Sequence, residues 1–194
     1  MQIYGIDLAK EKFDVSFLRL SSKSNVVTPV HHVVRNTQNG IKAFPKGLPS
    51  DSVLVAEHTG VYGERLLKMC TEMNIKIAYV GGHVIHTYKS GPDRGKTDEQ
   101  DCNVLREFGE RFTDKLVYTT FPEEDIYELR QLSRQRTMLV EERKRIMTAD
   151  KTEDCRPYRS EAVKRSMQHI VDLLDEEIKD MERDMLTVIR KHDK

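Results

Sequence analysis

The chain has 194 residues, which is enough for one domain with a helical appendage. It carries 32 Lys and Arg against 32 Asp and Glu, and this net charge of zero excludes a whole-molecule electrostatic clamp on nucleic acid but not a local one. No apolar run approaches the roughly 20 residues that span a bilayer, and Asp7 interrupts the segment where a signal peptide would be apolar. We therefore expect no membrane partner and a cytoplasmic location, which three widely spaced cysteines without a C-x-x-C pair also favour.

Charge density and glycine content divide the chain near residue 122. Residues 1–122 contain 30 charged side chains, whereas the shorter stretch 123–194 contains 34, and all ten glycines lie at or before Gly109. The sequence thus predicts two domains, an α/β domain over residues 1–122 and a helical hairpin or coiled coil over residues 123–194.

The first domain alternates strand-like and helix-like segments. Strands are predicted over 3–6, 12–20 and 26–34, close enough together to form an antiparallel meander. A short helix around 41–44, a buried strand over 52–56, a helix over 62–73 and a second buried strand over 75–80 follow. Residues 81–97 are rich in glycine and polar side chains and are predicted to be a mobile loop, before a helix over 98–112.

The second domain is predicted to consist of two long helices. One covers 123–149 and the other 161–190, and the intervening segment contains Pro157. Apolar residues recur at steps of three and four along the second helix, which is typical of a helical hairpin or coiled coil. Such polar helices are marginal in isolation, so we expect them to pack on each other or on a second copy of the chain.

Four carboxylates occupy positions that suggest a metal site. Asp7 and Glu57 each end a predicted strand, while Asp98 and Asp101 share one face of the predicted helix that begins at residue 98. Asp98 and Asp101 alone are readily explained by helix capping and the helix dipole, and Asp7 by a cap on the following turn. Glu57 is harder to explain in this way, because it directly follows the apolar run over 53–56. Gathered around one point, the four would repel one another and require cations, and oxygen ligands of this kind suit Mg²⁺ or Mn²⁺. Together they favour a metal site able to support phosphodiester cleavage.

The motifs that contain these acids resemble a known family. The segments Gly-Ile-Asp-Leu-Ala-Lys, Glu-His-Thr-Gly-Val-Tyr and Lys-Thr-Asp-Glu-Gln-Asp are similar to those of the DEDD transposases of bacterial insertion sequences, at positions 5–10, 57–62 and 96–101. The similarity continues into the helix after residue 129. The sequence departs from the family pattern at Gly81-Gly82, where an Asn-Pro-like turn is usual, and at Cys102, where a small residue is usual.

This resemblance implies a fold, a site and partners. It implies a ribonuclease-H-like (RuvC-like) α/β fold, an acidic tetrad of Asp7, Glu57, Asp98 and Asp101 as both catalytic and metal-binding residues, and DNA recombination guided by a structured RNA in the bacterial cytoplasm. Because recombination needs at least two active sites, we expect a dimer or larger homo-oligomer. Family members also carry a C-terminal domain with a nucleophilic serine, and none of the ten serines here has a comparable context. We therefore expect a recombinase module truncated before that domain.

Basic side chains suggest where nucleic acid would bind. Residues 127–149 have a net charge of +3, and residues 161–190 have a net charge of −3. Either the two helices attract each other, or some arginines of the first helix contact phosphates. The candidates for phosphate contact are Lys10, Lys96, Arg130, Arg134 and Arg136.

Three functions are consistent with this sequence. The leading hypothesis is a divalent-metal-dependent transposase or recombinase module that acts on DNA. The alternatives are a stand-alone nuclease of resolvase type, which needs no serine, and a non-catalytic fragment that binds RNA or DNA and dimerises. A sugar-kinase or actin-like ATPase also opens with a strand ending Gly-Ile-Asp, but it needs a Gly/Thr-rich phosphate loop where Leu-Ala-Lys follows here.

Overall fold

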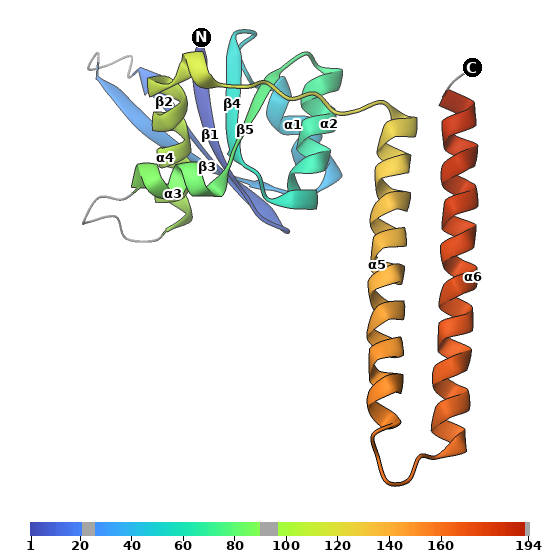
Figure 1. The fold of residues 1–194 in the computed structure, drawn as a ribbon. Helices are drawn as coiled ribbons and strands as arrows, with labels where there is room; N and C mark the ends of the chain where they lie inside the picture. The colour runs from blue at the N-terminus through green and yellow to red at the C-terminus, as the bar shows by residue number, and fades with distance from the viewer. Residues whose placement is uncertain (21–25, 90–96, 193–194) are drawn as a thin grey trace. The chain divides into compact units, whose positions relative to one another are not determined.

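The structure, a computed structural model, describes residues 1–20, 26–89 and 97–192. The chain forms two compact units, Met1–Phe121 and Pro122–Lys194, which are considered separately below. Figure 1 shows the mixed sheet of the first unit and the two long helices of the second.

A five-stranded mixed sheet forms the centre of the first unit, in the order β3-β2-β1-β4-β5. β1 pairs antiparallel with β2, which pairs antiparallel with β3, whereas β1, β4 and β5 run parallel. The predicted meander is therefore confirmed, and the sheet has the ribonuclease-H-like topology that the resemblance implies. The strands are β1 Gln2–Leu8, β2 Lys12–Leu20, β3 Val27–Arg35, β4 Ser52–Glu57 and β5 Lys76–Val80.

Helices cover both faces of this sheet. The Thr37 and Thr97 side chains accept hydrogen bonds from backbone N–H groups in the first turns of α1 and α4, which fixes where these helices begin. α1 and α2 pack on one face, and α3 and α4 pack on the other. The helical elements are α1 Gln38–Lys46, the short 3₁₀ turn η1 Gly60–Gly63, α2 Glu64–Glu72, α3 Gly82–Lys89, α4 Asp98–Arg111 and the 3₁₀ turn η2 Thr113–Lys115.

The prediction of a loop over residues 81–97 is wrong for its first half, which is α3. The Gly81 carbonyl accepts hydrogen bonds from the N–H groups of Val84 and Ile85, which closes the first turn. Ile85 is buried among side chains of β4 and α4, so tertiary packing outweighs the low helix propensity of the preceding glycines. Residues 90–96 lie outside the described part of the chain.

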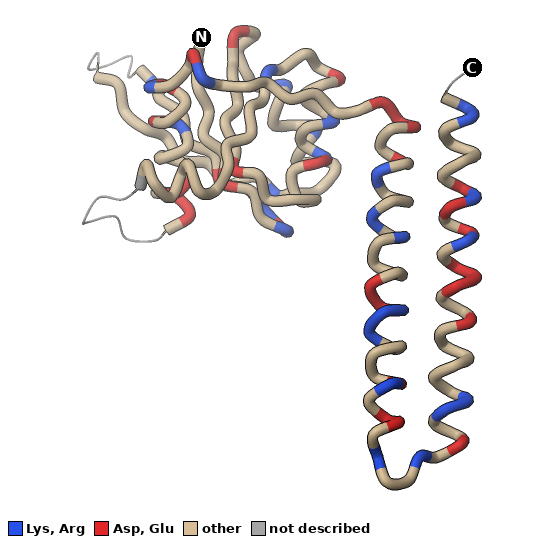
Figure 2. The backbone as a smooth tube through the Cα atoms, viewed as in Figure 1, with Lys and Arg blue, Asp and Glu red and all other residues tan. Residues whose placement is uncertain are grey.

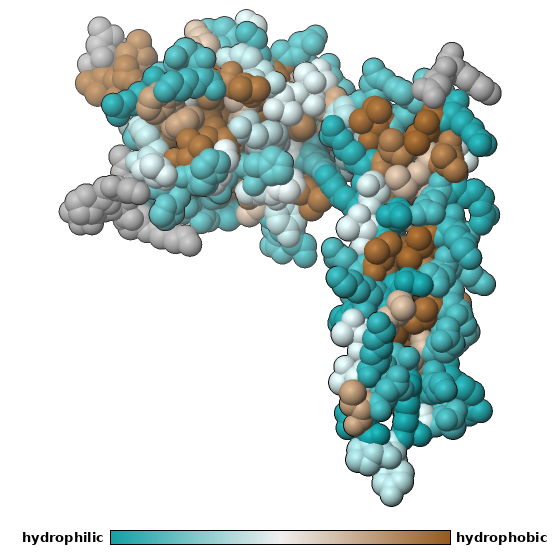
Figure 3. Space-filling model, in the orientation of Figure 1, coloured by the Kyte–Doolittle hydropathy of each residue, from teal (hydrophilic) through white to brown (hydrophobic). Residues whose placement is uncertain are grey.

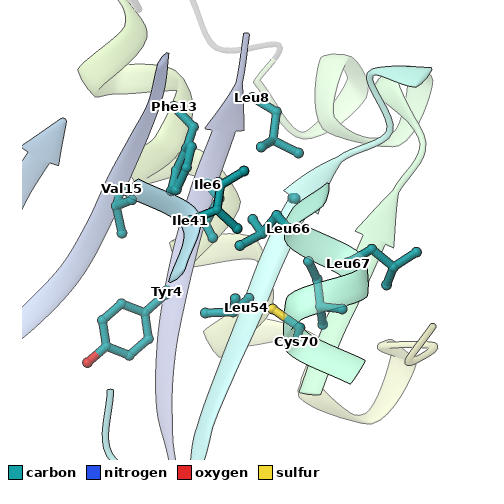
Figure 4. Close-up of a cluster of buried hydrophobic side chains, with 12 residues drawn as sticks. Tyr4, Ile6, Leu8, Phe13, Val15, Ile41, Leu54, Leu66, Leu67 and Cys70 are labelled. Carbon is teal, nitrogen blue, oxygen red and sulfur yellow. The ribbon is translucent and has the colours of Figure 1, made fainter. Parts of the chain in front are cut away.

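The strict alternation of strand side chains separates two cores. Tyr4, Ile6 and Leu8 of β1 point toward α1 and α2, where they join the cluster drawn in Figure 4. Ile3 and Gly5 point toward α4 instead. A side chain that is fully buried in such a core contributes about 1.5–3 kcal/mol relative to an exposed one. Asp7 follows the same alternation and therefore lies on the α4 face of the sheet.

The second unit is an antiparallel pair of long helices, α5 Glu124–Glu153 and α6 Glu161–His192, which confirms the predicted hairpin. Apolar side chains line the seam between them (Figure 3), and Val188 is buried there. Arg136 pairs with Glu182, and Arg143 forms a two-pronged pair with Asp175 at 2.6 and 3.2 Å. Figure 2 shows basic and acidic positions on both helices, and these two ion pairs between α5 and α6 support their antiparallel register.

Neither long helix, nor any other helix in the described ranges, is both long and apolar enough to cross a membrane.

Candidate metal and nucleic-acid site

Asp7 and Glu57 lie beside each other at one edge of the sheet. β1 and β4 are parallel neighbours in which Ile6 pairs with Ala56, so the two acids follow directly paired residues. Glu57 alternates with Val53 and Val55, which face α4, and it therefore lies on the same face as Asp7. The topology thus brings together two acids that are 50 positions apart in the sequence.

The first turn of α4 brings the other two predicted acids to this face. Asp98 and Asp101 are three residues apart, so they lie on one side of the helix. Gly5 permits the close approach of α4, because a Cβ at that position would lie 2.0 Å from the Cys102 carbonyl oxygen and 2.4 Å from the Arg106 nitrogen. The absence of a side chain at Gly5 therefore holds the acidic end of α4 close to β1.

The pKa of Asp7 reflects how close these acids lie to one another. Burial, followed by the negative charges of Asp101, Asp98, Asp14 and Glu57 in that order of importance, raises the pKa of Asp7 to about 6. Four carboxylates therefore lie close enough to disfavour ionisation of a fifth. We call these five residues, Asp7, Asp14, Glu57, Asp98 and Asp101, the acidic cluster.

Asp14 is a member that the sequence analysis missed. It lies directly opposite Asp7 across the β1–β2 ladder, and only 3% of its surface is exposed. His31 Nε2 of β3 lies 2.7 Å from its Oδ1. The alternation of Phe13, Asp14 and Val15 was the available signal, since it places the acid on the face opposite the apolar side chains.

Lys12 is a positively charged residue that contacts two members of the acidic cluster. Its Nζ lies 2.7 Å from Asp98 Oδ2 and 3.0 Å from Asp14 Oδ2, so it links α4 to β2. Hydrogen bonding to Lys12, followed by its positive charge, holds the pKa of Asp98 below the usual range. The negative charge of Asp98 is thus balanced by Lys12. The ionised form of Asp7 is instead disfavoured by burial and by the neighbouring acids.

Glu57 lies against the beginning of α3. A Cβ placed on Gly82 would lie only 2.5 Å from Glu57 Oε1, so a glycine at this position leaves room for the carboxylate. Gly82 is a further residue of the site that the sequence analysis, which predicted a loop here, did not recognise.

The donor chemistry of the cluster fits a hard divalent cation. All its candidate ligand atoms are carboxylate oxygens. The pKa of Asp7 is raised first by burial and then by repulsion from the other acids, and a bound cation would offset that repulsion. In the side-chain arrangement of residues 1–20, 26–89 and 97–192, no three His, Cys, Asp or Glu side chains are grouped closely enough to hold an ion. Asp98 instead contacts Lys12, so binding an ion through the full tetrad requires side-chain rearrangement.

The basic candidates fall in different places. Lys10 is exposed in the β1–β2 turn, at the same end of β1 as Asp7, whereas Lys96 lies outside the described residues. Arg130 and Arg134 are exposed on α5, one helical turn apart. Arg136 donates to Glu182 through Nε at 2.7 Å, so it joins the two helices of the hairpin.

Comparisons with known proteins agree with the motifs. The model of a transposase family, the DEDD transposases of IS110 type, matches residues 4–149. Pilin gene-inverting proteins from Moraxella bovis and Moraxella lacunata are each 30% identical over 112 residues, which is 54% of this chain but only 33% of theirs. The match therefore spans about a third of the length of these curated relatives.

Solved structures of low sequence identity were also found. A Thermus thermophilus RuvC structure aligns with a TM-score of 0.44 and 11% identity, covering 61% of this chain and 100% of that one. The T. thermophilus RuvC in complex with a Holliday junction substrate aligns with a TM-score of 0.44 and 10% identity, covering 61% and 99%.

Proposed function

Because this chain belongs to the IS110-type DEDD transposase family, we propose that its first domain is a divalent-metal-dependent module for DNA recombination. Asp7, Glu57, Asp98 and Asp101 are the proposed ligands and catalytic residues, and Mg²⁺ or Mn²⁺ is the proposed ion. The observation that carries the proposal is the convergence of these four acids, from the ends of two paired parallel strands and the first turn of α4. Burial, followed by repulsion from the neighbouring acids, raises the pKa of Asp7 to about 6 in keeping with this arrangement. Such mutual repulsion is characteristic of carboxylates arranged for cations.

The residues of the chain would hold and orient the reacting groups. A bound divalent ion would supply Lewis acidity toward a phosphodiester and lower the pKa of a bound water or hydroxyl. Asp7 would be held by β1, which lies between β2 and β4 in the sheet. Thr97 caps α4 and so fixes the turn that carries Asp98 and Asp101, while Gly82 leaves space for Glu57.

DNA and a structured guide RNA are the proposed partners. Lys10 and Lys96 flank tetrad residues in the sequence and are proposed to contact the backbone of the nucleic acid bound there. Arg130 and Arg134, exposed on the same helix, are proposed phosphate contacts. We assign Arg136 instead to the helix pair, because its guanidinium group is engaged with Glu182.

Assembly and location belong to the same proposal. Recombination joins DNA ends in pairs, so at least two copies of the protein would act together in the bacterial cytoplasm. Exposed apolar residues on the hairpin, including Ile170, Leu173 and Leu186, are consistent with self-association.

Nicking of supercoiled DNA tests the metal-dependent proposal. We expect the full chain with Mn²⁺ or Mg²⁺ to nick a supercoiled substrate only when a guide RNA is present. Asp7→Asn should abolish nicking, and Asp51→Asn should leave it intact, because Asp51 is an exposed acid paired with the N-terminus. Nicking of plain plasmid without RNA would favour the stand-alone nuclease instead. Nicking that persists in Asp7→Asn would refute the tetrad.

Measurements of RNA binding test the proposed contacts of Arg130 and Arg134 with a guide RNA. Replacing both Arg130 and Arg134 by alanine should weaken RNA binding and reduce its dependence on salt concentration, because fewer counterions are released. The matched control replaces Arg145, which is exposed on the same helix and paired with Glu142. Equal RNA affinity in the double variant and the unmodified chain would remove these arginines from the interface.

A further inference from the structure

Lys12 is held at the edge of the acidic cluster by two partners that differ in their freedom to move. Asp14 lies within the sheet, and its side chain is only 4% exposed, whereas the side chain of Asp98 is 59% exposed at the start of α4. The ammonium group lies within hydrogen-bond distance of both carboxylates, at 3.0 and 2.7 Å respectively.

The Lys12–Asp14 contact is the one that the fold requires. A buried carboxylate without a cation is costly, and Asp14 also lies opposite Asp7 in the ladder, so its charge needs a permanent partner. The nearby His31 supplies a charge only when it is protonated. The Lys12–Asp98 contact carries no such requirement, because water can solvate an exposed carboxylate.

We propose that Lys12 is a positioning residue that holds Asp98 while no divalent ion is bound and releases it when an ion binds, remaining paired with Asp14 throughout. This inference rests on the proposed metal site. The ion and the Lys12 ammonium group then compete for one carboxylate. Lys12 thereby keeps the acidic cluster stable in the absence of metal and sets how readily metal enters.

Removing the charge of Lys12 should therefore strengthen metal binding. Asp98 would be free to act as a ligand, and the repulsion between the ammonium group and the ion would disappear. Because the contact is half exposed, we expect Lys12→Met to raise the affinity of the protein for Mn²⁺ by about two- to fivefold. Lys12→Arg, which keeps the charge, should bind Mn²⁺ about as tightly as the unmodified chain.

Stability measurements separate this role from a purely structural one. Without metal, Lys12→Met should unfold at a lower denaturant concentration than the unmodified chain, because Asp14 and Asp98 lose the ammonium group that both contact. With saturating Mn²⁺, the difference should shrink, because the ion takes over that function. A lysine that merely supports the fold would cause the same loss of stability in both conditions.

The test is isothermal titration calorimetry of the full chain with Mn²⁺, repeated for the Lys12 variants, Asp7→Asn and Lys42→Met. Lys42 is an exposed lysine of α1 on the opposite face of the sheet, so its replacement controls for a change in net charge. Tighter binding in Lys12→Met alone, with none in Asp7→Asn, supports the inference. Unchanged or weaker binding in Lys12→Met overturns it while leaving the metal site in place. No binding by either the unmodified chain or Lys12→Met overturns the metal site and this inference together.

Discussion

Replacing Asp7 by asparagine should make the first domain more stable at neutral pH while removing its metal site. The pKa of Asp7 is raised from 3.8 to about 6, chiefly by burial and then by the neighbouring carboxylates. A raised pKa means that the folded state binds this proton more tightly than the unfolded state does. Ionisation of Asp7 therefore destabilises the fold above about pH 6 and has no such effect below about pH 4.

The size of this effect follows from the shift. Each pKa unit corresponds to about 1.36 kcal/mol, and screening by water at a half-exposed carboxylate reduces the total to about 1–2 kcal/mol. Asp7→Asn should thus raise the free energy of unfolding by about that amount at pH 7.5, and by progressively less as the pH falls toward 4. With the usual dependence of stability on urea, the midpoint of unfolding would increase by about 0.5–1 M.

Two buried cysteines provide an assay specific to this domain. Cys70 and Cys102 are buried, whereas Cys155 is exposed between α5 and α6, so in a Cys155→Ser background a thiol reagent reports only on unfolding of the first domain. Asp51→Asn is a control with a pKa shift of the opposite sign, because the N-terminal ammonium group lowers the pKa of Asp51. Removing the negative charge of Asp51 should therefore not stabilise the fold. If Asp7→Asn has the same urea midpoint as the unmodified chain from pH 5 to pH 8, the electrostatic reasoning is refuted.

Three further experiments test the packing around the site and in the hairpin. Gly82→Ala should displace the flexible end of Glu57 and weaken Mn²⁺ binding by about tenfold in calorimetry, with little change in the urea midpoint. Gly5→Ala should destabilise the first domain by about 3 kcal/mol in the thiol assay, because the new methyl group would collide with the backbone of α4; a well-folded variant would refute the close approach. A double-mutant cycle between Arg143 and Asp175, followed by thermal unfolding of the hairpin, should give a coupling of about 0.5–1 kcal/mol that decreases with salt, and zero coupling would contradict the pairing.

Local patterns were sufficient to predict the strands and to place the four acids of the proposed tetrad at strand ends and at the start of a helix. Alternation along β2 predicts which residues face the core. Acids that follow a predicted strand or begin a predicted helix can likewise be identified from the sequence alone. The same alternation places Asp14 on the face opposite the apolar side chains, but its position beside Asp7 depends on the strand register. The contact of Lys12 with Asp98 depends on α4, which begins 86 positions later. Helix α3 was missed for a related reason, since the burial of Ile85 against distant elements outweighs the local preference of two glycines.

The contact of Gly5 with α4 has a consequence for how such proteins diverge. The separation between the strand that carries Asp7 and the helix that carries Asp98 and Asp101 is fixed by backbone atoms meeting backbone atoms. Side chains of the Tyr4 and Ile6 core lie on the other face of the sheet, so changes in their volume do not alter that separation. Sequences can therefore vary widely in this core while a single glycine preserves the spacing of the carboxylates.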